Sequence, residues 1–173
     1  LMKTIGLAGN SSWSILNFRR NLIHELIKKG FIIHIIAPAD QSVSDLEDLG
    51  CIVHDIQLNR RSLNPFNNLL LIFRYKQIIT QLRLDYILTF NIKPNLFVCL
   101  ASYKLSTKVI VNISGLGSTF LKSNFLTKVI QFLYKISLKN AFTIFFQNQS
   151  DLNFFKEKQI CEASSFNLLP GSG

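Results

Sequence analysis

Three polar segments of the sequence carry residue types that suit the binding of phosphates and sugars, and each follows a short apolar run. They are Gly9-Asn10-Ser11-Ser12, Asn91-Ile92-Lys93-Pro94-Asn95 and Ser114-Gly115-Leu116-Gly117-Ser118. Glycines flanked by hydroxyl side chains let backbone N–H groups come close to a bound ligand. These segments are therefore the candidate binding residues of the chain.

The first segment lies between an expected strand and an expected helix. The apolar run from Thr4 to Ala8 is too short for a helix, whereas helical spacing begins near Trp13 and stops at Gly30. A helix N-terminus presents free N–H groups and a positive dipole end, which favours an anion or a sugar above the strand. An ordinary strand-to-helix turn explains the same residues, because the dinucleotide fingerprint G-x-G-x-x-G is absent.

The packing of this first helix is also predicted by its sequence. We expect its apolar stripe to face the sheet, and the stripe consists of Ile15, Phe18, Leu22, Leu26 and Ile27. Arg19 lies mostly off this stripe and is expected on the polar side. In the turn before the helix, Gly9 is expected to provide a residue that tolerates a positive φ angle.

Strand and helix patterns alternate along the whole chain. Strands are expected at residues 4–8, 31–37, 51–58, 85–90, 108–113, 143–147 and 165–169, and helices at 13–30, 44–49, 64–82, 91–105, 124–140 and 150–158. This alternation predicts an α/β, Rossmann-like fold with a mainly parallel sheet of about six to seven strands and helices on both faces. Loops at the carboxyl ends of such strands form the binding crevice.

Length and composition limit the classes of protein to consider. A chain of 173 residues, 48% of them hydrophobic, suffices for one well-packed domain. The net charge of +9 favours a polyanion or an anionic membrane surface as partner. Nucleic acid is not expected, because the basic residues are scattered and no nucleic-acid-binding motif is present. Three separated cysteines suggest neither disulfides nor a metal site, and no apolar run is long enough to cross a bilayer.

The expected helix over residues 124–140 places lysines on one line with phenylalanines beside it. Such a pattern is typical of a helix that lies in the plane of a membrane surface. The candidate membrane contacts are Lys122, Phe125, Lys128, Phe132, Lys135 and Lys139. The expected buried side is formed by Leu126, Val129, Ile130 and Leu133. A solvated basic face with both rings tucked into the core explains the pattern equally.

Seven short motifs occur in order along the chain. They are Gly9 with its Ser-rich turn, Asn17-Phe18-Arg19, Arg61-Ser62-Leu63-Asn64-Pro65-Phe66, Asn91-Ile92-Lys93-Pro94-Asn95, Gly115-Leu116-Gly117-Ser118, Phe146-Gln147-Asn148 and Leu169-Pro170-Gly171-Ser172-Gly173. Together they resemble the N-terminal half of family 4 glycosyltransferases. The resemblance is greatest to bacterial members that build capsule, O-antigen or lipid-linked oligosaccharides.

This resemblance implies a GT-B enzyme, in which two Rossmann-like domains face each other across a cleft. Residues 1–173 would form the single N-terminal, acceptor-binding domain, and the C-terminal domain that holds the nucleotide sugar would be absent from this chain. The paired glutamates of the family belong to that C-terminal domain, so no catalytic residue is assigned here. The implied donor is a nucleotide sugar, expected to be UDP-linked, and no cofactor or metal is implied.

By matching position, the resemblance also assigns binding roles within this chain. Contact with the donor diphosphate falls to Gly9, Asn10, Ser11 and Ser12, and acceptor binding falls to Asn91, Lys93, Asn95, Ser114, Gly115, Gly117 and Ser118. Many relatives carry a histidine just after the fifth strand, where this chain has Ser114. The implied acceptor is a lipid-linked or free saccharide, and the implied location is the cytoplasm, peripheral on the inner face of the cytoplasmic membrane.

The sequence also bears on functions other than glycosyl transfer. A short-chain oxidoreductase or epimerase is disfavoured, because the glycine fingerprint and a Tyr-x-x-x-Lys pair are both absent. Half of a GT-B-type UDP-sugar epimerase and a non-enzymatic membrane-recruiting module remain alternatives.

Overall fold

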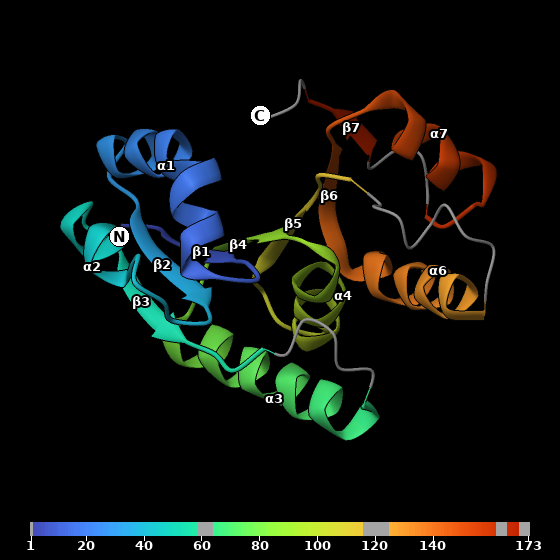
Figure 1. Cartoon of the computed structure of the whole chain (residues 1–173), viewed down its shortest axis with the longest axis horizontal. Coiled ribbons are helices and arrows are strands. Elements are labelled where there is room, and N and C mark those ends of the chain that lie inside the picture. The colour runs from blue at the N-terminus through green and yellow to red at the C-terminus, as the bar shows by residue number, and fades with distance from the viewer. Residues whose placement is uncertain (1, 59–63, 116–124, 162–165, 170–173) are drawn as a thin grey trace.

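The computed structural model describes residues 2–58, 64–115, 125–161 and 166–169. Within these ranges, strands and helices alternate along the chain (Figure 1). The strands are β1 (Thr4–Ala8), β2 (Ile32–Ala37), β3 (Ile52–Asp55), β4 (Tyr86–Phe90), β5 (Lys108–Ile113), β6 (Ala141–Phe146) and β7 (Phe166–Leu168). The helices are α1 (Ser12–Lys28), α2 (Val43–Asp48), α3 (Pro65–Leu82), α4 (Ile92–Ala101), α6 (Phe125–Ser137), the 3-10 turn η1 (Leu138–Asn140) and α7 (Gln149–Glu157).

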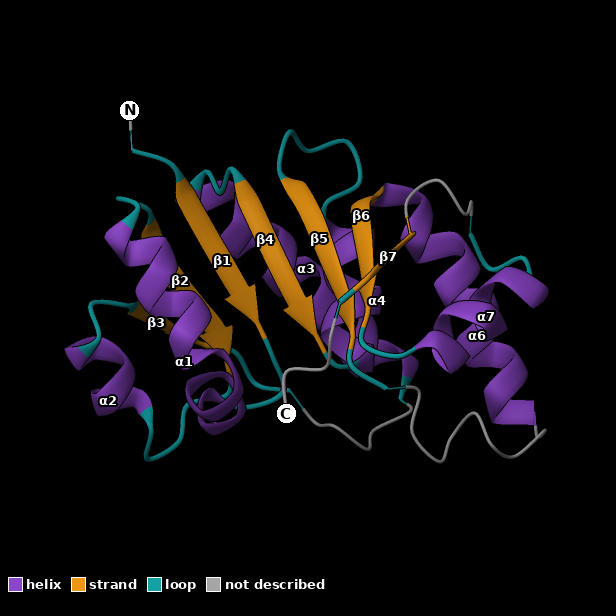
Figure 2. Cartoon of the chain, turned by 90° about the horizontal axis from the view of Figure 1, so that it is seen from above, coloured by secondary structure: helices purple, strands orange, loops and turns teal. Residues whose placement is uncertain are grey.

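The described strands form one parallel sheet in the order β3-β2-β1-β4-β5-β6-β7. The chain builds outward from β1 to β3 and then crosses back to place β4 on the other side of β1. This reversal between β1 and β4 is a topological switch point, where α/β sheets bind ligands beyond the carboxyl ends of their strands. In Figure 2 the arrows of β1 and β4 end at the same edge. The predicted fold class is confirmed.

Helices cover both faces of the sheet (Figure 1). Helices α1 and α2 pack on one face, where their apolar residues join one buried cluster with β1 and β2. Helices α3, α4 and α6 lie on the other face, with α4 between α3 and α6 and in contact with both. The larger of the two hydrophobic cores lies under these three helices, as expected for a sheet buried on both faces.

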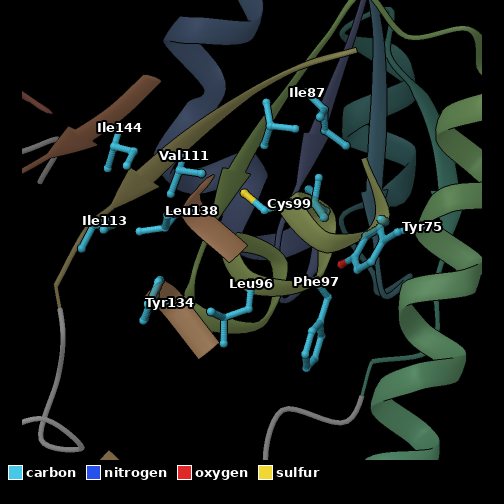
Figure 3. Packing of buried hydrophobic residues seen from close by; sticks show 14 of the residues in the cluster. Tyr75, Ile87, Leu96, Phe97, Cys99, Val111, Ile113, Tyr134, Leu138 and Ile144 are labelled. Atoms are coloured by element: carbon cyan, nitrogen blue, oxygen red, sulfur yellow. The ribbon is translucent and has the colours of Figure 1, made fainter. Parts of the chain in front are cut away.

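The larger core is built from residues that are distant in sequence. Tyr75 of α3, Phe97 and Cys99 of α4, Val111 of β5 and Tyr134 of α6 are all buried in it. Figure 3 shows their side chains gathered around α4. This packing fixes the position of α4, whose N-terminus begins at the candidate site.

The start of α3 follows the capping pattern that its sequence predicts. Pro65 is the first helical residue, and the side-chain oxygen of Asn64 accepts a hydrogen bond of 2.9 Å from the Phe66 N–H. The helix packs on the sheet through Leu71, Tyr75 and Ile79, which are buried.

The packing face of α1 differs from its prediction in the first turns. Its fully buried residues are Ser12, Ile15, Leu16, Arg19 and Ile23. Phe18, which we expected to face the sheet, is 54% exposed and packs edge-on against the ring of Trp13 at 6.0 Å. Arg19, which we expected on the polar side, is 8% exposed. The helix is rotated relative to its most hydrophobic stripe, and a cation is thereby buried.

Candidate functional site

Two of the three predicted loops meet at the switch point. The Asn10 N–H, after β1, donates a hydrogen bond of 3.2 Å to the side-chain oxygen of Asn91, after β4. The two residues are 81 positions apart in sequence, and the parallel pairing of β1 with β4 brings them together. Ser114, at the end of the neighbouring strand β5, lies at the same edge of the sheet.

The N-terminus of α1 is capped by groups of the chain itself. Ser11 Oγ accepts a hydrogen bond of 3.2 Å from the Ser14 N–H. The Ser12 N–H and hydroxyl both donate to the Pro38 carbonyl, at 3.1 and 3.0 Å. The Asp40 carboxylate accepts from the Trp13 N–H at 2.9 Å. A carboxylate thus occupies part of the positive helix end where an external anion was predicted, and the diphosphate role of this loop stays a prediction.

Gly9 is required for a different reason from the one predicted. It is absent from the residues with positive φ. A Cβ atom on Gly9 would instead lie 2.9 Å from Cγ1 and 3.0 Å from Cδ1 of Ile15. Ile15 is fully buried and faces the sheet from α1. The glycine therefore permits the close approach of the first loop to α1.

A hollow of about 240 Å³ with a mixed polar and apolar lining opens at the switch point, and we call it the switch-point hollow. Its lining includes Phe18, Arg19, Phe90, Asn91, Ser114 and Gln147. These residues come from α1 and from the carboxyl ends of β4, β5 and β6. Amide and hydroxyl groups that converge next to a cation and an aromatic ring suit a sugar that carries an anionic group.

Arg19 is held in this hollow by two described contacts. Its guanidinium carbon lies 4.4 Å from the centre of the Phe90 ring, a cation–π geometry. Its Nη1 donates a hydrogen bond of 2.9 Å to the Phe18 carbonyl. Burial lowers the pKa of Arg19 below its usual value, because desolvation disfavours the charged form. Arg19 was not predicted to take part in binding, and only its place in the Asn17-Phe18-Arg19 motif pointed to it.

Asn91 has a strained backbone. Its φ of 75° and ψ of 159° lie in a region that is almost confined to glycine. Its carbonyl accepts from the Asn95 N–H at 3.0 Å to begin α4. Strain of this kind persists only where surrounding contacts fix it, and it concentrates at functional sites.

The other two predicted residues of this loop point elsewhere. Lys93 Nζ donates a hydrogen bond of 3.2 Å to Asn68 on α3, and burial lowers the pKa of Lys93. Asn95 is 2% exposed, accepts from the Thr89 hydroxyl at 2.7 Å and donates to the Asn112 carbonyl at 3.1 Å. In contrast to the acceptor contact predicted for it, Asn95 has a structural role that joins β4 to β5.

The third loop is described in part. Ser114 and Gly115 are exposed, and Gly115 has a φ of 151° that favours glycine. Gly117 and Ser118, predicted to bind the acceptor, lie outside the described residues, as does Lys122. Gln147, which the sequence analysis did not select, lines the hollow from the end of β6 and donates to the Asn112 side chain at 3.3 Å.

Helix α6 presents its predicted basic line to solvent. Lys128, Lys135 and Lys139 are exposed, Phe132 is 62% exposed, and Ile136 lies on the same face. The side chain of Phe125 lies outside the description. The buried face of α6 is centred on Tyr134 and differs in part from the prediction, because Val129, Ile130 and Leu133 are only half-buried.

A larger hollow of about 500 Å³ lies at the opposite, amino-terminal edge of the sheet. Lys3, Arg83, Asp85 and Lys108 line it. Asp85 there accepts the Thr4 N–H at 2.7 Å, which joins the starts of β1 and β4. None of the predicted binding loops reaches this edge, so the smaller hollow at the switch point is the candidate site.

Comparison with known proteins identifies the family of the chain. Residues 5–148 match the family model described as Glycosyl transferase 4-like. The chain belongs to this family. It is also 33% identical over 175 residues to N,N'-diacetylbacillosaminyl-diphospho-undecaprenol alpha-1,3-N-acetylgalactosaminyltransferase of Campylobacter jejuni, a match covering 95% of this chain and 46% of that protein.

Solved structures show the same fold at low sequence identity. A glycosyltransferase from Rickettsia africae matches 97% of this chain and 43% of its own, with a TM-score of 0.71 and 16% identity. UDP-GlcNAc 2-epimerase from Methanocaldococcus jannaschii matches 96% of this chain and 45% of its own, with a TM-score of 0.65 and 15% identity. This member of the Glycosyl transferase 4-like family therefore spans about half the length of the proteins it matches.

Proposed function

We propose that the chain is the acceptor-binding half of a glycosyltransferase that moves a sugar from a nucleotide sugar to a lipid-linked saccharide in surface polysaccharide synthesis. The observation that carries this proposal is the 33% identity, over 95% of the chain, to a transferase whose name specifies a diphospho-undecaprenol-linked substrate. The switch-point hollow supports it, because its amide and hydroxyl groups suit sugar hydroxyls.

In this proposal the chain binds and orients the acceptor. Asn91, Ser114 and Gln147 contact acceptor hydroxyl groups, and Gly9 to Ser12 approach the diphosphate of a UDP-linked donor from the N-terminal side of the cleft. The donor is held mainly by a second Rossmann-like domain, which supplies the paired glutamates of the family. Stabilisation of the leaving diphosphate then needs groups from both sides of the cleft. We therefore expect the 173-residue chain alone to turn over no UDP-sugar.

The test is an assay of the complete gene product with labelled UDP-sugars, with and without a polyprenyl-diphosphate-linked saccharide. A transferase moves label into the lipid only when that acceptor is present. A UDP-sugar 2-epimerase changes the sugar nucleotide without any acceptor, and this outcome would replace the proposal with the epimerase alternative. Turnover by the 173-residue chain above a heat-inactivated control would contradict the proposed division of roles.

The lipid-linked acceptor leads us to place the protein at the inner face of the cytoplasmic membrane, in peripheral contact with its anionic surface. Within the described ranges, no helix combines the length and apolar character needed to cross a bilayer. An exposed line on α6 and the following turn η1 suits such a contact, and it is formed by Lys128, Phe132, Lys135, Ile136 and Lys139. Lys122 and Phe125 are proposed to extend it.

Helix α3 offers a second surface of the same kind. Phe66, Leu69, Leu70 and Phe73 are 81%, 51%, 49% and 61% exposed, and they recur at helical spacing on one face. Helices α3 and α6 flank α4 on the same side of the sheet. We therefore include this apolar face of α3 in the proposed membrane contact.

A further inference from the structure

Arg19 is a charged residue buried on a helix face that otherwise packs against the sheet. It is 8% exposed, its guanidinium stacks at 4.4 Å on the ring of Phe90, and its Nη1 donates to the Phe18 carbonyl at 2.9 Å. These contacts come from α1 and β4 and hold the guanidinium in one orientation. A planar cation fixed in this way is pre-organised to bind an oxyanion with parallel hydrogen bonds.

Most backbone donors of the first loop and of the start of α1 have partners within the chain. The N–H groups of Gly9 and Asn10 donate to the Ile36 carbonyl and to the Asn91 side chain. Those of Ser12, Trp13 and Ser14 donate to Pro38, Asp40 and Ser11. An anion that enters the hollow therefore meets the Arg19 guanidinium as the charged donor, rather than a row of unengaged backbone amides.

We propose that Arg19 is the phosphate-binding residue of the switch-point hollow and that it holds one phosphate of a diphosphate-containing substrate. Phe18 borders the same hollow with an apolar ring, and Asn91, Ser114 and Gln147 border it with polar groups. The hollow of about 240 Å³ is smaller than complete small-molecule pockets of roughly 300–1,000 Å³, so it suits one charged group and the atoms attached to it.

Burial of Arg19 strengthens the proposed interaction between its guanidinium and a phosphate. The Arg19 cation is less well solvated than a surface arginine, and this desolvation lowers its pKa. Opposite charges attract more strongly at such a partly desolvated position than in water. Under the proposed function, the diphosphate is either the UDP of the donor or the polyprenyl diphosphate of the acceptor. The inference rests on the proposed function only for this choice of ligand.

The experiment titrates the 173-residue chain with UDP and, separately, with farnesyl diphosphate. Calorimetry measures each Kd, and the Nε–H signal of Arg19 is followed by NMR in the unsubstituted chain. We expect at least one of the two diphosphates to bind and to shift this signal. Dependence on Arg19 in the farnesyl diphosphate arm assigns the site to the acceptor, and dependence in the UDP arm assigns it to the donor.

Substitution separates a phosphate contact from a structural role. Arg19→Met should weaken the Kd on the order of 10- to 100-fold, because it removes charged hydrogen bonds to the ligand. Arg19→Lys keeps the positive charge but loses the planar fork, so its Kd should lie between those of the unsubstituted chain and Arg19→Met. Arg20→Met is the matched control, since Arg20 is the exposed neighbour on the same helix and the charge change is identical.

Three results would overturn the inference. They are equal Kd values for Arg19→Met and the unsubstituted chain, an Nε–H signal that does not move at saturation, and no binding of either diphosphate. If Arg19→Met does not fold, as judged by circular dichroism, Arg19→Lys and the NMR titration decide the matter. If the complete gene product transfers sugar but diphosphate binding does not depend on Arg19, the inference about Arg19 is rejected and the proposed function stands. If diphosphate binding depends on Arg19 but the complete gene product transfers no sugar, the proposed function is rejected and the inference about Arg19 stands.

Discussion

Asn91 joins two features at the residue scale, a strained backbone and a side chain that orders the neighbouring loop. The strain of φ 75° and ψ 159° costs on the order of 1–3 kcal/mol. The side-chain oxygen accepts the Asn10 N–H at 3.2 Å, a hydrogen bond with a net contribution of about 1 kcal/mol. Glycine would relieve this strain but would lose the hydrogen bond to Asn10. An asparagine at this position therefore fits a role in ordering the two loops of the candidate site.

Two substitutions at Asn91 separate these effects. Asn91→Ala loses the hydrogen bond and keeps the strain, so it should be the less stable variant. Asn91→Gly loses the same bond and relieves the strain, and it should exceed Asn91→Ala in stability by about 0.5–2 kcal/mol after the entropic cost of glycine is deducted. Urea unfolding measures both. Asn17, an exposed residue inside α1, is the control, because there glycine should be less stable than alanine.

Gly9 and Ile15 form a second pair whose coupling is measurable. Gly9→Ala places a Cβ about 3 Å from the Ile15 side chain and should destabilise the chain by about 1–3 kcal/mol. Ile15→Ala alone opens a cavity in the core. The double variant should be more stable than the sum of the two single effects predicts, because the truncated side chain leaves room for the Cβ. Strict additivity in a double-mutant cycle of urea unfolding would contradict this packing.

Side-chain roles were the least predictable part of the candidate site. Asn91, Lys93 and Asn95 share one sequence segment, yet the start of α4 directs Asn91 into the hollow, Lys93 toward α3 and Asn95 into the core. Arg19 was missed because an arginine beside a more hydrophobic stripe is expected in water. Its burial depends on Phe90, which lies 71 positions away, and no local pattern contains that contact.

At the scale of elements, a histidine pair ties the edge strand β3 to β2. His34 Nδ1 and His54 Nε2 lie 3.0 Å apart, so one neutral ring donates to the other. Desolvation lowers the pKa of both histidines, and the charge of His54 lowers that of His34 further. Asp55, the other ionisable residue of these two strands, accepts a hydrogen bond from the Ala39 N–H instead. The contact between the rings requires at least one neutral ring nitrogen.

This pair predicts how stability depends on pH. A histidine whose pKa is lower in the folded chain binds fewer protons there than in the unfolded chain. Its contribution is therefore complete above the unfolded value of about 6.5 and is lost as pH falls through that value toward the folded pKa. We expect thermal midpoints to fall as pH is lowered from about 7 to 5. His54→Gln, which cannot titrate at this position, should flatten this dependence.

The boundaries of helices could be predicted from the sequence where capping residues mark them. The Asn64-Pro65 start of α3 and the strand β5 over Lys108–Ile113 were predicted at their observed positions. The rotation of α1 was not predicted, because Phe18 is far more hydrophobic than Arg19, the neighbouring residue that is buried instead. Its ring is exposed beside Trp13 and at the edge of the hollow, where tertiary placement outweighs the helical stripe.

At the scale of the whole molecule, the parallel sheet and its switch point were predictable because each strand is short, apolar and followed by a helix. The candidate site at the switch point is built from both layers of helices. Helix α1 brings a cation to it from one face, and α4 begins beside it on the other. Helices α3, α4 and α6 then form a layer whose outer side carries the exposed apolar face of α3 and the basic line of α6.

Contact with an anionic bilayer is the prediction that belongs to this layer. We expect the chain to co-sediment with phosphatidylglycerol vesicles more than with phosphatidylcholine vesicles, and this binding to weaken steeply with salt. Near an anionic leaflet each lysine contributes on the order of 1 kcal/mol, so Lys128, Lys135 and Lys139 together should raise binding by about two orders of magnitude. Replacing these three lysines with glutamine should remove most of the preference for the anionic lipid.

Matched variants decide whether the contact depends on this surface or on net charge alone. Arg20 and Lys28 of α1 and Lys29 at its C-cap are exposed on the other face of the sheet from α6. Their replacement with glutamine removes the same total charge. If net charge alone governed binding, both triple variants would lose it equally, which would contradict the prediction. Phe66→Ser combined with Phe73→Ser should weaken binding to both kinds of vesicle, because inserted rings act independently of headgroup charge. The thermal midpoints of all these variants should stay close to that of the parent, since exposed side chains contribute little to folding.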